Sequence, residues 1–287
     1  MTGKLGLVLG SGSARGWAHI GVIQELAEAG YKPDIVCGCS IGAFVGAAYA
    51  NNDQDKLEQW VRSLTWQKVL KLLDFSFNGG LIKGDKLMEF FELHIGNRKF
   101  SELSLPFACV ATDLANGHEV WLREGYVAAA VRASIALPGL FRPVQQEGRL
   151  LVDGALVNPV PVSVARALGA EVVIAVDLGS DIVGKNNHKS ASSKVAQSDW
   201  RQGLAGRLGV AERNGIPSII NVLTSSIDIM QRRIARSRLA GEPADVLLTP
   251  HLAHLALMDY HRADEAISEG RDAVKRMLPA IKAVLPQ

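Results

Sequence analysis

The chain lacks three features that would place it in a protein class at once: many cysteines, a long apolar run and an excess of charge of one sign. Only three of its 287 residues are cysteines, at positions 37, 39 and 109. A small, odd number of cysteines is typical of a reducing compartment and argues against a disulfide framework. No run of about 18 consecutive apolar residues occurs, so no membrane-spanning helix is expected.

Charge is nearly balanced, with 31 lysines and arginines against 29 aspartates and glutamates and a net charge of +2. So small an excess gives no electrostatic reason to expect nucleic acid as a partner. No group of histidine, cysteine and acidic residues has the spacing of a zinc or calcium site, so neither a metal nor another cofactor is expected. Residues 1–10 lead straight into an apolar segment rather than forming a secretory signal, which favours a cytoplasmic protein.

Short apolar runs alternate with segments of helical periodicity from the start of the chain. Strands are expected at 5–9, 35–37, 106–112, 118–122, 149–152 and 172–176. Helices are expected at 16–29, 41–50, 85–94, 126–133 and 159–168, with two more between 54 and 73. Such alternation predicts a mostly parallel central sheet with helices on both faces, a three-layer α/β/α fold. Sites in these folds gather at the carboxyl ends of the strands.

The composition changes after Leu178. Residues 179–203 are rich in serine, lysine, asparagine and glutamine and have no apolar periodicity, so they are expected to form a polar surface insert. A helix at 219–239, a strand at 243–249 and a last helix from Tyr260 to Met277 follow. We expect one domain over 1–287, with a core at 5–178 and residues 204–287 packed on it. The arginines at 232–238 form either a solvated helical face or a contact with an anionic membrane.

The most informative local pattern is Gly38-Cys39-Ser40-Ile41-Gly42, between an apolar strand and a run of small residues. A serine on so sharp a strand-to-helix turn is exposed, and it must hold strained backbone angles. Gly38 and Gly42 remove side chains that would collide with neighbouring backbone. The pattern indicates a nucleophile elbow with Ser40 as the nucleophile.

A second pattern, the glycine loop from Gly10 to Gly16, follows the first strand and opens a helix. Backbone N–H groups at such a turn bind anionic oxygens. A dinucleotide fingerprint would need an acidic residue at the end of the second strand, and Asp34 lies before that strand instead. The loop is better interpreted as an oxyanion hole, which would lie beside Ser40 if the two strands are neighbours.

A third pattern is Asp153-Gly154-Ala155, at the end of another apolar run. An aspartate before glycine is often only a turn former. No histidine lies in a context typical of a Ser-His-Asp hydrolase, and His251 and His254 are the only late histidines near a strand end. These patterns alone therefore favour no Ser-His-Asp triad, and they assign no base to Ser40.

Taken together, these motifs resemble the patatin-like phospholipase family, most closely its small bacterial members of the RssA type. The resemblance covers about 5–178. It rests on the ordered glycine loop, the elbow and Asp153-Gly154-Ala155, strengthened by Ala111-Thr112-Asp113, Arg132-Ala133-Ser134, Pro138-Gly139 and the stretch 153–161.

The resemblance implies a Ser–Asp dyad that hydrolyses acyl esters of lipids. Carried over residue by residue, it makes Ser40 the nucleophile and Asp153 its base, with the N–H groups of Gly12 and Ser13 as oxyanion donors. Arg15 falls where related lipases place a positive charge near the lipid phosphate. Peripheral contact with the inner membrane surface is a further option for such an enzyme, and the oligomeric state is left open.

The chain departs from the family in one respect. Members often carry a run of glycines in the first motif, where this chain has Ser11 and Ser13. A positive φ at either serine would be costly. A regulatory or scaffold protein with the same fold and little turnover is therefore an alternative, as is an acyltransferase or thioesterase that uses the same acyl-serine.

Overall fold

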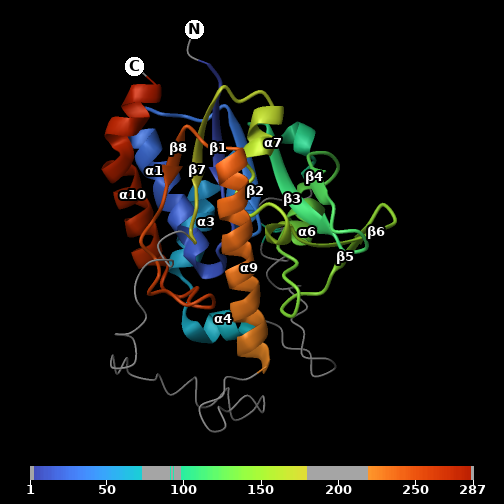
Figure 1. The fold of residues 1–287 in the computed structure, drawn as a ribbon. Helices are drawn as coiled ribbons and strands as arrows, with labels where there is room; N and C mark the ends of the chain where they lie inside the picture. Colours follow the sequence, from blue (N-terminus) through green and yellow to red (C-terminus); the bar gives the residue numbers. More distant parts are fainter. Residues whose placement is uncertain (1–2, 73–90, 92, 94–97, 180–218, 286–287) are drawn as a thin grey trace.

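The computed structural model describes residues 3–72, 91, 93, 98–179 and 219–285, and all structural statements below refer to these. An eight-stranded sheet lies at the centre of this part of the chain (Figure 1), with the order β5-β6-β3-β2-β1-β7-β8, and β4 also pairs with β3. The strands are β1 (Leu5–Leu9), β2 (Ile35–Cys39), β3 (Phe107–Asp113), β4 (Glu119–Leu122), β5 (Val144–Gln146), β6 (Arg149–Asp153), β7 (Val172–Val176) and β8 (Val246–Leu248). From β8 through β7, β1 and β2 to β3 the sheet is parallel, as the alternation of strands and helices predicts.

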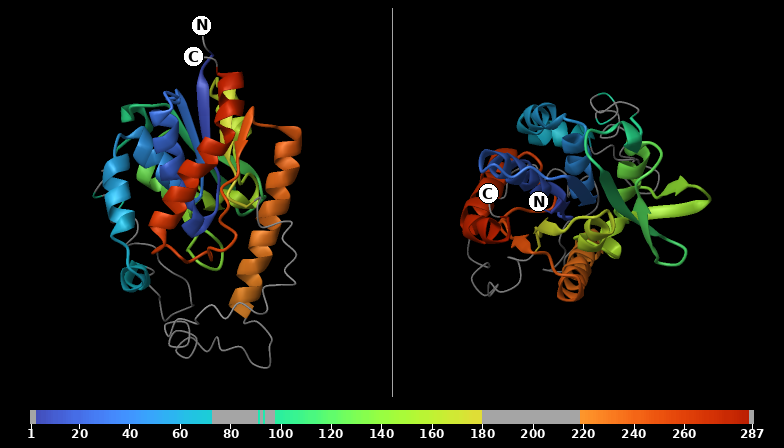
Figure 2. Two further views of the ribbon diagram at one scale, coloured as in Figure 1. Left: turned by 90° about the vertical axis from the view of Figure 1, so that its left-hand side faces the viewer. Right: turned by 90° about the horizontal axis from the view of Figure 1, so that it is seen from above.

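Helices cover both faces of this sheet (Figure 2), which confirms the three-layer α/β/α architecture. They are α1 (Ala18–Glu28), α2 (Ile41–Ala50), α3 (Gln54–Arg62), α4 (Trp66–Leu72), α6 (Val127–Ser134), α7 (Val162–Ala167), α9 (Ile219–Gly241) and α10 (Ala263–Val284). Three short 3-10 turns are η1 (Ser13–Trp17), η2 (Phe100–Glu102) and η3 (Gly154–Leu156).

The two faces follow the period-two pattern of the strands. In β1, Leu5, Leu7 and Leu9 are buried against the layer that contains α1, α2, α6 and α10. Val8, on the opposite face, is buried in a second cluster with residues of α7 and α9. Burial of β1 on both faces explains its unbroken apolar sequence.

The register of the sheet brings distant motifs to one level. Leu9 of β1 pairs with Gly38 of β2, so the glycine loop and the elbow leave the sheet side by side. Cys39, the last residue of β2, pairs with Val110 of β3, so Ser40, which follows it, is level with Ala111. On the other side of β3, the antiparallel strand β6 pairs Asp153 with Ala111. Ser40 and Asp153 therefore leave the sheet at the same level, on either side of β3.

Helix α10 packs against α1 at close range because glycines lie at the crossing. A β-carbon on Gly21 would lie 1.9 Å from the carbonyl oxygen of Ile267, and one on Gly270 would lie 2.0 Å from that of Ala18. Only glycine allows this backbone approach. The crossing holds the N-terminal end of α10, and the segment before it, next to the glycine loop.

Several boundaries differ from those predicted. The helix expected at 159–168 begins only at Val162. Pro161 disfavours helical backbone angles at Val160, the residue before it, so the helix cannot start earlier. Tyr260 was expected on the last helix but lies in the turn before it, where the side chain of Asp259 accepts a hydrogen bond from the backbone of Ala256. The expected helix at 85–94 and the polar insert at 179–203 lie, apart from residues 91, 93 and 179, outside the described residues. Within the described ranges, no helix has both the length and the apolar composition needed to cross a membrane.

Candidate active site

Ser40 occupies a strained turn between β2 and α2. Its backbone has φ 56° and ψ −123°, a conformation that costs on the order of 1–3 kcal/mol for a residue with a side chain. The turn is compact because a β-carbon on Gly38 would lie 2.4 Å from the carbonyl oxygen of Gly42, and one on Gly42 would lie 2.0 Å from that of Leu9. The N-terminus of α2 also directs its partial positive charge to this point. These are the features that the sequence predicts for a nucleophile elbow.

The Ser40 hydroxyl contacts the carboxyl group of Asp153 directly. Ser40 Oγ donates a hydrogen bond of 2.6 Å to Asp153 Oδ2, although 113 residues separate the two. Asp153 Oδ1 accepts a second bond, of 2.9 Å, from the backbone N–H of Ala155. With one oxygen held by η3, the other is fixed on the hydroxyl, which is the geometry a general base requires.

Asp153 is 1% exposed, and no ion pair to it is found among the described residues. Burial disfavours its charged form and raises its pKa from 3.8 to about 7, while the hydrogen bonds from Ser40 and Ala155 partly oppose this shift. A carboxylate with so high a pKa is a stronger base than a solvated one. Burial thus moves Asp153 toward the range in which a group exchanges protons at neutral pH.

Two further side chains, whose roles the sequence patterns did not reveal, support the dyad. Ser134, at the end of α6, is fully buried; its Oγ accepts a 3.0 Å hydrogen bond from the backbone N–H of Ser40 and donates one of 2.7 Å to Val110. The hydroxyl of Thr112 donates to the carbonyl oxygen of Asp153 at 2.8 Å. In the sequence, Ser134 stands in Arg132-Ala133-Ser134 and Thr112 in Ala111-Thr112-Asp113, two of the phrases that carry the family resemblance, but neither phrase indicates what the side chain does.

The glycine loop leaves two backbone donors available. Ser11 N–H donates to the carbonyl oxygen of Pro159 and Ala14 N–H to that of Leu257. The N–H groups of Gly12 and Ser13, between them, have no hydrogen-bond partner among the described residues, and both residues line the same pocket as Ser40. Unpaired amides beside a nucleophile are what an oxyanion hole consists of.

The other glycines of the motifs provide close packing. Added β-carbons would lie 2.5 Å from the carbonyl oxygen of Val176 at Gly10, 2.3 Å from the side chain of Ile41 at Gly16, and 2.2 Å from the carbonyl oxygen of Val110 at Gly154. Ser13 has φ 53°. A positive φ costs a serine backbone about 1–2 kcal/mol, as anticipated for a serine in this loop. Ser11 has no such value.

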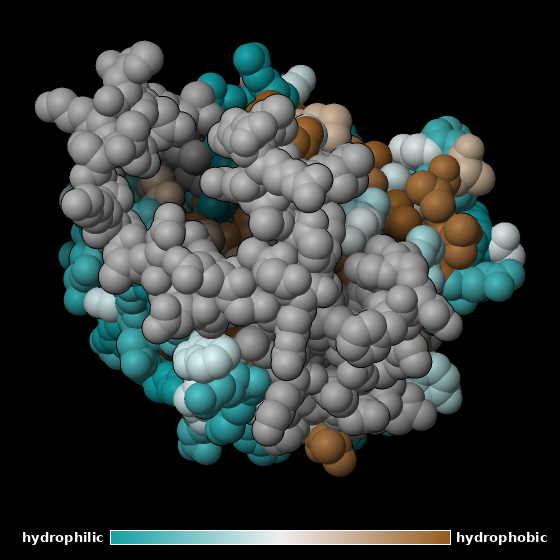
Figure 3. Space-filling model, turned by 90° about the horizontal axis from the view of Figure 1, so that it is seen from below, coloured by the Kyte–Doolittle hydropathy of each residue, from teal (hydrophilic) through white to brown (hydrophobic). Residues whose placement is uncertain are grey.

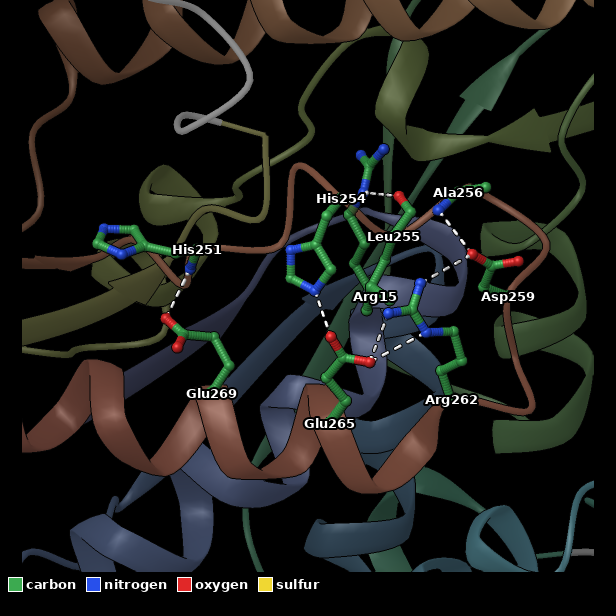
Figure 4. Close-up of polar contacts among 9 residues, drawn as sticks. All are labelled: Arg15, His251, His254, Leu255, Ala256, Asp259, Arg262, Glu265 and Glu269. Atoms are coloured by element: carbon green, nitrogen blue, oxygen red, sulfur yellow. Dashed lines mark hydrogen bonds and ion pairs between the residues drawn. The ribbon is translucent and has the colours of Figure 1, made fainter. Parts of the chain in front are cut away.

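Arg15 lies at the edge of the same pocket, but its guanidinium is already engaged. It is buried; its Nε donates to the carbonyl oxygen of Leu255 at 3.1 Å (Figure 4), and one terminal nitrogen lies 3.8 Å from a carboxylate oxygen of Asp228 on α9. Asp228 also pairs with Arg232 one turn further along α9. A lipid phosphate at Arg15 would therefore compete with Asp228.

The alternative nucleophiles and bases do not reach the dyad. The Cys39 thiol is buried, and burial raises its pKa well above the ordinary value, so it stays protonated. Burial lowers the pKa of His19 to about 4, and its Nε2 lies 2.8 Å from the carbonyl oxygen of Gly10. His254 pairs with Glu265 on the protein surface. Asp113 accepts hydrogen bonds from the loop that follows it, as expected for a structural aspartate.

Ser40 and Asp153 open into one pocket with two kinds of wall. One wall is apolar and consists of residues from η1, α2, α3 and the segment after α6, namely Trp17, Phe44, Trp60, Ile135, Leu140 and Phe141. The other wall includes the polar and charged lining residues, which come from the glycine loop, the end of β7 and α9, and it also contains apolar residues such as Ile227 and Leu257; the polar and charged residues are Arg15, Asp177, Asp228, Gln231 and Arg232. Hydrophobic side chains of the described residues are visible in the view from below in Figure 3. No cluster of three or more metal-ligating side chains occurs among the residues that the structure describes.

Comparisons with known proteins agree with this picture. A family model described as patatin-like phospholipase matches residues 7–166. An uncharacterised NTE family protein of Mycobacterium tuberculosis is 33% identical over 332 residues, which cover 97% of this chain and 92% of that protein. Lysophospholipase nte1 of Emericella nidulans is 31% identical over 303 residues, which cover 97% of this chain but 18% of the fungal protein.

A solved structure shares the fold. VipD from Legionella pneumophila aligns with a TM-score of 0.61 and 14% identity over 98% of this chain and 67% of VipD. None of these comparisons tests the RssA-type assignment, which stays a prediction. Because the family model spans more than half of the chain and the mycobacterial relative aligns with nearly all of it, the chain belongs to the patatin-like phospholipase family, and with it to the lipid hydrolases.

Proposed function

We propose that this chain hydrolyses fatty-acyl esters of lipids through an acyl-Ser40 intermediate, with Asp153 as the general base. The observation that carries the proposal is the 2.6 Å hydrogen bond from Ser40 Oγ to a buried carboxylate inside a largely apolar pocket. The name of the Emericella relative, a lysophospholipase, supports a lysophospholipid as one substrate to test.

In the proposed reaction, Ser40 Oγ attacks the ester carbonyl carbon while its proton passes to Asp153 Oδ2. The carbonyl oxygen becomes an oxyanion that the N–H groups of Gly12 and Ser13 bind. Collapse of this intermediate breaks the bond to the leaving alcohol, which takes the proton back from Asp153. Asp153 then takes a proton from a water molecule as the water oxygen attacks the acyl carbonyl carbon. Collapse of this second intermediate breaks the bond to Ser40 Oγ, which receives that proton from Asp153, and the fatty acid leaves.

The magnitudes are adequate for such a dyad. General-base assistance contributes typically about 100- to 10,000-fold, and one oxyanion donor about 100- to 1,000-fold. Ser40 is a weak acid, so its proton must move as the bond to the carbonyl carbon forms. A pKa of about 7 at Asp153 brings base and operating pH close together, which is where general-base catalysis is most effective.

The two walls of the pocket suggest how a substrate lies. The aromatic and aliphatic wall near Trp17, Phe44 and Trp60 suits an acyl chain. The charged wall suits a polar headgroup, and it keeps Arg15 as our candidate for a phosphate contact if the phosphate displaces Asp228. This orientation places the scissile ester between the two walls, at Ser40.

We infer a cytoplasmic enzyme that meets its lipid at a membrane surface. Helix α9 lines the pocket with Ile227 and Gln231, while Val222, Ile229 and Met230 on its other side are exposed large apolar residues. These apolar side chains are exposed beside Arg233 and Arg236, and a helix that exposes apolar and basic residues next to a lipid-binding pocket is suited to contact the lipid interface. The scaffold alternative started from the serine-substituted glycine loop and the polar insert at 179–203. The part of this motivation that concerns the loop is weaker here, because the Ser13 hydroxyl donates one hydrogen bond to Leu257 and accepts another from Tyr260, and these bonds offset the strain.

The test is hydrolysis of a lysophospholipid and of short nitrophenyl esters by purified wild-type protein and two variants. Ser40→Ala and Asp153→Asn are each expected to lower kcat at least 1,000-fold, because each removes one partner of the proton transfer. Ser63→Ala and Asp55→Asn change exposed residues of the same types and are matched controls with expected wild-type rates. Ester hydrolysis that survives intact in Ser40→Ala would refute the proposal, and a wild-type protein with no activity on any ester would favour the scaffold alternative.

A further inference from the structure

The glycine loop contains a residue whose backbone conformation the sequence disfavours. Ser13 has φ 53°, and it is one of only four non-glycine residues with positive φ in the described part of the chain. Ser40, the elbow serine, is another. Without support, the backbone at Ser13 would relax toward negative φ, and the peptide plane that carries its N–H group would turn with it. The direction of a proposed oxyanion donor therefore depends on whatever holds Ser13.

The side chain of Ser13 supplies that support through the segment before α10. Ser13 Oγ donates a hydrogen bond of 2.6 Å to the carbonyl oxygen of Leu257. The hydroxyl of Tyr260 lies 2.7 Å from the same Oγ. Because the one proton of Ser13 is committed to Leu257, Tyr260 must be the donor in the second bond.

Neighbouring residues of the loop are held by the same segment. Ala14 N–H donates to Leu257 at 3.2 Å, the Arg15 side chain donates to Leu255 at 3.1 Å, and Trp17 Nε1 donates to the carbonyl oxygen of Tyr260 at 3.1 Å. Residues 13–15 and 17 thus all bond to the 255–260 segment. Four of the five residues of η1 (Ser13–Trp17) are therefore anchored, and this turn has little freedom to reorient.

The 255–260 segment is itself fixed on α10 (Figure 4). Glu265 in the first turn of α10 binds both His254, at 2.5 Å, and Arg262, at 2.6 Å, while Asp259 accepts a 3.0 Å bond from the backbone of Ala256. Tyr260 also lines the pocket that contains Ser40 and Asp153. Burial raises the pKa of its hydroxyl, and the charge of Asp153 adds to this rise, so the hydroxyl stays protonated and can donate to Ser13.

We propose that Tyr260 is a positioning residue, whose hydroxyl, through Ser13 Oγ, aims the backbone N–H of Ser13 at the oxyanion. In this chain, hydrogen bonds hold Ser13 at a positive φ that a glycine would adopt without such support. The inference rests on the proposed function, because it assigns Tyr260 a task in the same reaction. It predicts that the 255–260 segment affects kcat although none of its atoms takes part in the reaction.

The test is a double-mutant cycle on kcat and KM with an uncharged ester. Tyr260→Phe removes one hydroxyl and is expected to lower kcat about tenfold, a fraction of what a complete oxyanion donor is worth, with KM changed less than twofold. Ser13→Ala, which keeps the strain and loses both hydrogen bonds, is expected to lower kcat more than Ser13→Gly, which removes the strain as well. In the Ser13→Gly background, Tyr260→Phe should have no further effect, because its hydroxyl no longer has Ser13 to hold.

Tyr31→Phe is the matched control, since the buried Tyr31 hydroxyl has no hydrogen-bond partner among the described residues; its kcat should equal that of the wild type. If Tyr260→Phe does not fold, as judged by circular dichroism, the order of Ser13→Ala and Ser13→Gly decides. Wild-type kcat in Tyr260→Phe, an equal loss in both backgrounds, or Ser13→Ala as fast as Ser13→Gly would overturn this inference while leaving the Ser–Asp dyad intact. A wild-type chain that cleaves no ester would overturn both.

Discussion

Burial sets what a single carboxyl group can do in this molecule. Asp153 sits at the end of β6 with one oxygen bonded to a backbone amide and the other to the Ser40 hydroxyl. Neither contact fully compensates the loss of water, so the neutral acid is favoured and the pKa rises to about 7. The charged form that accepts the Ser40 proton is then only partly populated at neutral pH.

The pH dependence of kcat/KM follows from this. Below a pH of about 7 Asp153 is protonated and cannot accept a proton, so kcat/KM should fall about tenfold for each unit of decreasing pH and level off above the pKa. The measurement is a pH profile from about 4.5 to 9 with an uncharged ester, with circular dichroism at each pH to show that the fold persists. A profile that stays flat down to pH 5 would mean that the base is an ordinary, solvated carboxylate or that Asp153 is not the base.

The two dyad residues can be predicted from the sequence, but the side chains that hydrogen-bond to the elbow and to the glycine loop cannot. Ser40 and Asp153 stand in short patterns whose local geometry carries their chemistry, a strained turn in one case and a strand end in the other. Ser134 and Tyr260 stand in no such pattern. Each acts through a hydrogen bond to a residue more than 90 positions away, and no local spacing encodes a contact of that kind.

At the scale of elements, most strands and helices follow from the apolar patterns, whereas the antiparallel pairing of β4 and β6 with β3 does not. A strand at 149–152 is predicted and corresponds to β6, but β5 is not predicted, because it is three residues long and only partly buried. The turn between β5 and β6, Glu147-Gly148, has positive φ at both residues, so Glu147 adopts a conformation that its type disfavours. The direction of β6 relative to β3 decides whether Asp153 reaches Ser40, and strand direction is a property of the assembled sheet.

The contact between α1 and α10 should be sensitive to the substitution of a single glycine. A β-carbon on Gly270 would meet the carbonyl oxygen of Ala18 at 2.0 Å, so Gly270→Val must push the helices apart. Overpacking of this kind typically costs about 1–3 kcal/mol, and we expect the free energy of unfolding to fall by at least that amount. Thermal and denaturant unfolding of the variant would measure it.

Gly241→Val, at the end of α9, is the matched control, because a β-carbon there would meet no atom within 4 Å. It should leave the unfolding free energy nearly unchanged. Equal stability of Gly270→Val and the wild type would contradict the close approach of the two helices.

At the scale of the whole molecule, the site is assembled from segments far apart in the sequence. The glycine loop, the elbow, β6, α9 and the 255–260 segment all contribute to one pocket. Strand β8, from the C-terminal part of the chain, pairs with β7 of the predicted core, which supports our inference of one domain over 1–287. Alignment of 97% of this chain with 18% of the fungal relative is consistent with a unit of this size within longer proteins.

The central claim is that this assembly turns Ser40 into a nucleophile, and covalent labelling tests it most directly. A fluorophosphonate probe should attach to the folded wild-type protein in a 1:1 ratio, with peptide mass spectrometry placing the probe on Ser40, because the phosphoryl oxygen can occupy the oxyanion site. Labelling should be absent in Ser40→Ala and in urea-unfolded protein, and at least 100-fold slower in Asp153→Asn. A probe found on another residue, or a labelling rate at Ser40 that Asp153→Asn leaves unchanged, would contradict the account.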